Sequence, residues 1–283
     1  MRFGLLLLAL FPFSSSDFSH VRLTLQPEGQ PPSAELVRAL EDRLDRLDVD
    51  GTVEITGERV VVDMPRVQEA ERVRQLLTRS VSLELRLVRF PEAGGGSPSR
   101  EAVLEHFGRQ FPPELELMLG DVLNDEGLST GKQYYAVERT ALVTARDIRR
   151  ASPSVGQFND PIVMFSLTPD AGEAFGRATE ANIGSGIAII LDGEVLSAPR
   201  IQSRITDEGI IEGGFTEMEA RDLALLLGSG PLPARVTVVD QQVSEAVPDR
   251  RFWVAMTALA VFFLLFCAAL VILFRRGGQP RPI

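Results

Sequence analysis

An uninterrupted apolar run near the C-terminus constrains this chain most. Residues 252–274 contain no Asp, Glu, Lys, Arg or His, and Thr257 is the polar exception. As a helix this run would be about 34 Å long, enough to cross a hydrocarbon core of about 30 Å. A buried core helix is the alternative, but such helices usually keep a polar stripe. The run therefore predicts a transmembrane helix at 252–274, followed by a cytoplasmic tail at 275–283.

A shorter apolar stretch begins the chain, where Arg2 precedes Phe3 to Phe13 and three serines follow. About eleven apolar residues are too few to span a bilayer comfortably, but they fit the core of a signal peptide cleaved near Ser16. A short anchor that is retained is the alternative for residues 1–16. Both interpretations place the main domain on the extracytoplasmic side of the inner (plasma) membrane. We expect a single-pass protein, with the helix at 252–274 as its span.

Composition argues against several kinds of function. The net charge of −10 disfavours a general nucleic-acid binder, which needs a basic face for phosphates. Cys267 is the single cysteine and lies in the apolar run, so the globular part offers no disulfide and no thiol nucleophile. His20 and His106 have no second histidine or cysteine at metal-ligand spacing. We therefore expect no catalytic residue, no cofactor and no metal.

The first half of the chain alternates between strand and helix patterns. Val21, Leu23 and Leu25 alternate with polar neighbours, as in a half-buried strand. The following segments are a helix at 35–47, strands at 53–55 and 60–64, a helix at 70–77 and a strand at 81–87. In the first helix, Arg43 is expected on the charged face, away from the core. The order β-α-β-β-α-β predicts one ferredoxin-like lobe over residues 17–90.

The second half repeats this architecture after a less regular stretch. Residues 91–133 are expected to be a linker and irregular segment, because their start is rich in Gly, Pro and Ser, with a short helix near Glu101 to Phe107. The elements expected in 134–248 are strands at 134–137 and 163–168, a helix opened by Thr168-Pro169, a hairpin at 187–196, an extra strand near 210–215, a helix capped by Thr216 with Glu219, and a closing strand at 236–238. This is again roughly β-α-β-β-α-β.

Residues 163–240 resemble the first periplasmic domain of SecD, the auxiliary subunit of the bacterial Sec translocase. The most specific stretches are the run LDGEVLSAP, from Leu191 to Pro199, and Gly214-Phe215-Thr216 before a Leu-rich helix. Residues 35–87 also look like the base region of that family. The resemblance implies an α+β fold of two ferredoxin-like lobes, a base and a head, which move relative to each other while contacting emerging preprotein.

The resemblance singles out a set of motif residues, for which we expect structural roles in place of direct substrate contacts. They are Asp192, Gly193, Ser197, Ala198, Pro199, Gly214, Phe215 and Thr216.

The resemblance also implies a function, which is that of a non-enzymatic component of Sec-dependent protein export. Its expected partners are translocating preprotein and subunits of the Sec translocase. Members of the family usually continue with five further membrane helices that carry acidic groups, whereas 252–274 has none, so a truncated form with a separate channel-forming partner is expected. An envelope scaffold that reuses the domain is the alternative. A hydrolase is disfavoured, because two histidines give no credible Ser-His-Asp arrangement.

Overall fold

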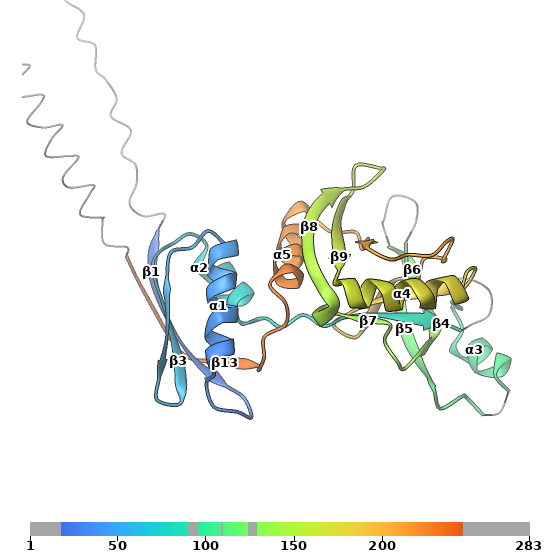
Figure 1. Ribbon diagram of the computed structural model, residues 1–283, viewed down its shortest axis with the longest axis horizontal. Coiled ribbons are helices and arrows are strands. Elements are labelled where there is room, and N and C mark those ends of the chain that lie inside the picture. The colour runs from blue at the N-terminus through green and yellow to red at the C-terminus, as the bar shows by residue number, and fades with distance from the viewer. Residues whose placement is uncertain (1–17, 90–95, 109, 124–128, 246–283) are drawn as a thin grey trace, which may run out of the picture.

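The computed structural model describes residues 18–89, 96–108, 110–123 and 129–245. The expected N-terminal segment 1–16, the transmembrane helix 252–274 and the tail 275–283 lie outside these residues. Among the helices that are described, none has the length and apolar character to cross a membrane. Figure 1 shows two lobes side by side, which we call the base (residues 18–78 and 232–245) and the head (residues 83–228).

The base is a four-stranded antiparallel sheet with two helices. Its elements are β1 (Ser19–Pro27), α1 (Ala34–Arg46), β2 (Thr52–Thr56), β3 (Arg59–Val67), α2 (Ala70–Thr78) and β13 (Val236–Glu245). The strand order is β13-β1-β3-β2, which is the order of a ferredoxin-like sheet. The alternating residues of β1 that face the helices, Val21, Leu23 and Leu25, are completely buried, as the sequence predicts.

The fourth strand of the base is not the expected one. The prediction that the strand near 81–87 closes the lobe 17–90 is wrong, because β4 (Leu83–Val88) pairs with strands of the head. β13 takes that place and pairs with β1 from Ser19 opposite Glu245 to Pro27 opposite Val236. Both edges of β4 are used in the head, by β10 on one side and by β6 and β7 on the other. The base is therefore assembled from the two ends of the described chain, and the head is inserted between them.

Five strands of the head close into a ring. They are β4, β5 (Leu115–Leu123), β6 (Ser129–Glu138), β10 (Gly186–Leu191) and β11 (Glu194–Ser197). β4 pairs with β10, β10 with β11, β11 with β5, β5 with β6, and β6 again with β4. The interior of the ring is filled by Val88, Tyr135, Val137, Ala188, Ile190 and Val195. β7 (Val143–Thr144) adds to β4, and α3 (Arg100–His106) buries Val103 beside β6.

A second sheet of the head contains β8 (Ile148–Val155), β9 (Pro161–Leu167) and β12 (Glu208–Ile211), in the order β12-β9-β8. The remaining elements are the short 3-10 helix η2 (Ala145–Asp147), α4 (Pro169–Ala181) and α5 (Glu217–Gly228). α5 packs on β8 and β9, and on its other side it faces the base (Figure 1). The largest apolar core lies between this sheet, α4, α5 and the inner strands β4 and β10.

The head was expected to be a second ferredoxin-like lobe, but the structure shows a different α+β arrangement. The individual elements at 134–137, 163–168 and 187–196 are present, but they are divided between the ring and the second sheet, and the closing strand 236–238 belongs to the base. Three strands, β5, β7 and β8, were not expected. β5 lies in the segment 91–133, which its composition had indicated to be a linker. The strand was missed because Pro112-Pro113 and Gly120 interrupt the alternating pattern.

Candidate functional site

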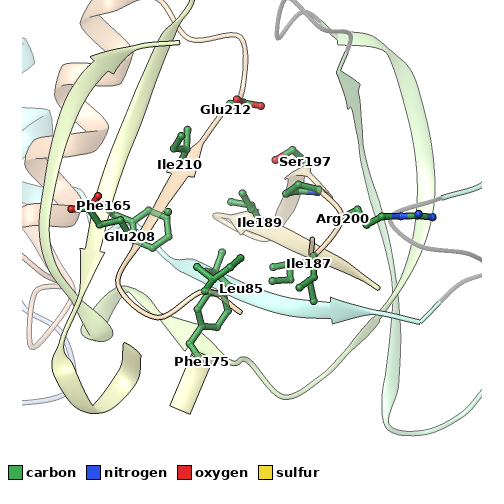
Figure 2. Close-up of a pocket in the computed structure, with 14 residues that line it drawn as sticks. Leu85, Phe165, Phe175, Ile187, Ile189, Ser197, Arg200, Glu208, Ile210 and Glu212 are labelled. Carbon is green, nitrogen blue, oxygen red and sulfur yellow. The ribbon is translucent and has the colours of Figure 1, made fainter. Parts of the chain in front are cut away.

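A groove of about 350 Å³ opens in the head between β12 and the hairpin β10–β11. Figure 2 shows Ile210 of β12 on one wall and Ile187, Ile189 and Ser197 on the other, with Leu85 and Phe175 below. We call this cavity the head groove. The residues that line it are Leu85, Phe165, Phe175, Ile187, Ile189, Ser197, Pro199, Arg200, Ile201, Ile205, Glu208, Gly209, Ile210 and Glu212.

The head groove combines an apolar interior with a charged mouth. The side chains of Phe165, Phe175 and Ile201 line the groove and are buried, whereas Ile210 on the wall is 47% exposed. Arg200, Glu208 and Glu212 are exposed at the rim. Such a cavity, apolar with a few polar groups at defined points, suits an apolar side chain carried on a polar backbone.

One buried polar atom of a residue that lines the head groove lacks a hydrogen-bond partner among the described residues. The Ser197 hydroxyl is buried, and it has no hydrogen bond to any other described residue. A buried polar group without a partner is uncommon in native structures, because leaving it unsatisfied costs about 1–3 kcal/mol. Ser197 also lines the groove (Figure 2), but its hydroxyl oxygen lies beneath the groove surface, because almost none of that oxygen is accessible to solvent.

The motif residues at the start of the LDGEVLSAP run connect the head to the crossing between the lobes. Asp192 and Gly193 both have positive φ, 50° and 88°, as a tight two-residue hairpin turn requires. The Asp192 carboxylate accepts hydrogen bonds from the Ser82 backbone N–H and from Arg79 Nη2, both at 2.9 Å. The Asp192 N–H donates to the Ser82 carbonyl at 2.8 Å. This turn therefore holds residues 79–82, the first segment that crosses from base to head.

The other motif residues are divided between three places. Ser197 and Pro199 line the head groove, and Ala198 packs against the core of the ring. Gly214, with φ of 63°, and the half-buried Phe215 lie between β12 and α5. The motif is thus not one cluster, and only its Ser197–Pro199 part reaches the groove.

Thr216 and Glu219 form the predicted capping box at the start of α5. The Thr216 hydroxyl accepts from the Glu219 backbone N–H at 3.2 Å, and the Glu219 carboxylate accepts from the Thr216 backbone N–H at 2.8 Å. The backbone and side-chain hydrogen bonds from Thr216 lower the pKa of Glu219. This cap fixes the end of α5 that follows β12.

Arg43 is a buried arginine that contacts both segments connecting the lobes, residues 79–82 and 229–231. The sequence had predicted an exposed position for it. Arg43 of α1 is 1% exposed, so its expected position on the charged face is wrong. Its guanidinium donates to the carbonyls of Leu76, Leu77 and Arg79 at 3.0, 3.0 and 2.6 Å, and to that of Gly230 at 3.3 Å. Burial lowers the pKa of Arg43 to about 10, so it stays charged at neutral pH. No signal in the local sequence separates it from its exposed neighbours.

A direct ion pair also joins the lobes. Arg72 of α2 donates to Asp222 of α5, with the closer contact at 2.6 Å, and this carboxylate raises the pKa of Arg72.

The described residues hold no group of three or more His, Cys, Asp or Glu side chains arranged for a metal ion.

The comparisons with known proteins match this chain to SecD and SecDF proteins. The family model described as the SecDF P1 head subdomain matches residues 121–234. Protein translocase subunit SecD of Aquifex aeolicus is 35% identical over 213 residues, which cover 75% of this chain and 38% of that protein. SecD of Elusimicrobium minutum is 29% identical over 278 residues, or 93% of this chain and 58% of that protein. The chain thus spans between about two fifths and three fifths of the length of these relatives.

Two solved structures share the fold. The crystal structure of SecDF in its super-membrane-facing form has a TM-score of 0.59 at 26% identity, covering 80% of this chain and 30% of that one. A structure of SecDF, described as a membrane component that enhances protein export, has a TM-score of 0.56 at 27% identity, covering 77% of this chain and 98% of that one.

The fold and the groove define a two-lobed α+β domain in which a head with an apolar cavity is inserted into a ferredoxin-like base. The family match in the head and the relatives that extend through the base agree with that arrangement. The chain contains a first periplasmic domain of the SecD family.

Proposed function

We propose that this protein is a non-enzymatic component of Sec-dependent protein export, and that it holds translocating polypeptide on the extracytoplasmic side of the inner membrane. The observation that carries the proposal is the head groove, which is apolar inside and charged at its mouth, within a SecD-type head. An unfolded segment passing the membrane exposes the apolar side chains and backbone groups that such a groove can take up.

The proposal extends to topology and partners. The apolar run 252–274 would tether the domain to the membrane, with the motif residues keeping the head folded and attached to the base. This run carries no Asp, Glu, Lys, Arg or His, so it offers no acidic group for proton movement. We therefore assign proton coupling to membrane segments of the Sec translocase other than this run.

Site-specific photocrosslinking in cells tests the proposal. A crosslinker at Ile210, in the wall of the head groove, should give adducts with an export-arrested preprotein. The matched control is Ile55 of the base, because the two isoleucines are 47% and 46% exposed. Adducts at both positions, or at neither, would contradict the groove as the binding site. Unchanged secretion after deletion, together with altered envelope assembly, would instead favour the scaffold alternative.

A further inference from the structure

The free edge of β12 is the starting observation. In the order β12-β9-β8, β12 pairs with β9 on one side, and no described strand pairs with its other side. The Asp207 carbonyl accepts from the Leu167 N–H at 2.8 Å, and the same register continues with Gly209 opposite Phe165 and Ile211 opposite Val163. In an antiparallel pair, residues directly opposite alternate between hydrogen-bonded and non-hydrogen-bonded pairs.

This alternation decides where each backbone group of β12 points. Asp207, Gly209 and Ile211 direct their N–H and C=O groups toward β9. The residues between and after them, Glu208, Ile210 and Glu212, direct theirs away from the sheet. All three of these residues line the head groove. Figure 2 shows β12 between β9 and the opposite wall that carries Ile187, Ile189 and Ser197, so the free edge faces the cavity.

We propose that the polypeptide bound in the head groove adds as an extended strand along the free edge of β12, an inference that rests on the function proposed above. The outward backbone groups of Glu208, Ile210 and Glu212 supply hydrogen-bond donors and acceptors for the ligand backbone, and these bonds do not depend on the ligand's sequence. Alternate side chains of an extended strand point to opposite faces, so every second side chain of the ligand can enter the apolar interior.

The charged residues at the mouth of the head groove indicate which polypeptide segments it favours. Among the described residues, Asp207 is paired with Arg149 and Arg204 with Glu180, whereas Glu208 and Glu212 form no ion pair. Arg200 is the basic residue at the rim, so the mouth is acidic on balance. Unpaired carboxylates attract cations more strongly than those already paired. The favoured ligand is therefore an unfolded segment with an apolar side chain next to Lys or Arg.

Peptide binding to the purified full chain tests the mode of binding. The probe is a fluorescent Lys-flanked peptide of alternating Val and Thr, compared with the same peptide whose central amides are all N-methylated. N-methylation removes the donors for the β12 edge while keeping every side chain, so the affinity should fall about tenfold or more. A Glu-flanked peptide of the same core should also bind more weakly than the Lys-flanked one.

A matched pair of variants tests the same edge from the protein side. Ile210→Pro removes an outward N–H, whereas Ile210→Val keeps it, and proline is tolerated on a free edge because no ladder bond is lost. Affinity should fall about tenfold in I210P and stay within about twofold in I210V. If I210P does not fold, the N-methylated peptide still decides the question.

The outcomes separate the two proposals. Equal binding of the methylated and unmethylated peptides, with crosslinking at Ile210 retained, would overturn strand addition and leave the export function standing. If no peptide binds and no preprotein crosslinks at Ile210, both proposals fail.

Discussion

Arg43 offers the sharpest test of how the two lobes are held together. The substitution Arg43→Met removes the guanidinium and keeps a long apolar stem in its place. The change leaves the carbonyls of Leu76 and Leu77 without their buried donor, and it releases Arg79 and Gly230, which lie on the two segments that cross between the lobes.

The size of the effect follows from opposing contributions. Hydrogen bonds to a charged group contribute about 1.5–3 kcal/mol each, and the carbonyls of Leu76, Leu77 and Arg79 share the two hydrogens of Nη1, so these contacts together supply roughly 3–6 kcal/mol. The part-buried bond from Nη2 to Gly230 adds about 1 kcal/mol. Against this stands the burial of the charge, which lowers the pKa of Arg43 to about 10, and that shift corresponds to about 3 kcal/mol. We expect a net loss of about 3 kcal/mol in the free energy of unfolding.

Urea and thermal unfolding of the full chain, followed by far-UV circular dichroism, measure this loss. For a protein of this size the melting temperature should fall by about 6–12 °C. Arg38→Met is the matched control, because Arg38 lies exposed on the same helix and its loss should change stability by about 0.5 kcal/mol or less. A loss below about 1 kcal/mol in R43M, or an equal loss in R38M, would refute the reasoning.

Two further predictions concern the head. Gly120→Ala should destabilise the chain by about 1–3 kcal/mol in urea unfolding, because the added Cβ would lie 2.4 Å from Val195 Cβ and 2.5 Å from the Val195 carbonyl, where β5 meets β11. The neighbouring L119A, at a position 42% exposed, should cost less, and equal losses would argue against closure of the ring at this point. Glu219→Gln keeps an acceptor for the Thr216 N–H but removes the negative charge near the start of α5, so it should lower the melting temperature at neutral pH through a loss of about 0.3–1 kcal/mol. Because the pKa of Glu219 is lowered from 4.5 on folding, this contribution is present above pH 4.5 and is lost as the pH falls through the folded value. The difference between the two proteins should therefore shrink in acid, and a difference that does not change with pH would contradict the role of the carboxylate.

Local features of the fold were predictable from the sequence. The alternation at Val21, Leu23 and Leu25 locates β1, the Thr216–Glu219 pair locates the start of α5, and Asp192-Gly193 locates a hairpin turn. Each of these depends on neighbours within a few residues, so the information lies in the local pattern.

The features that failed depend on distant contacts. The alternation of β4 shows that alternate residues are buried, but it does not say which sheet buries them, and the strand joined the head. Arg43 has the spacing of an exposed helix residue, and its carbonyl acceptors come from α2 and from the segment after α5. The position and lining of the head groove were not predicted either, because β12, the hairpin β10–β11 and Phe175 meet only after the chain has folded.

The pairing of β1 with β13 has a consequence for the order in which the chain gains structure. β1 is the first described strand to leave the ribosome or the membrane pore, and β13 is the last. One edge of β1 must therefore wait, unpaired and open to wrong partners, until the whole head has emerged. An exported protein built in this way would itself be a client that benefits from protection during its own biogenesis.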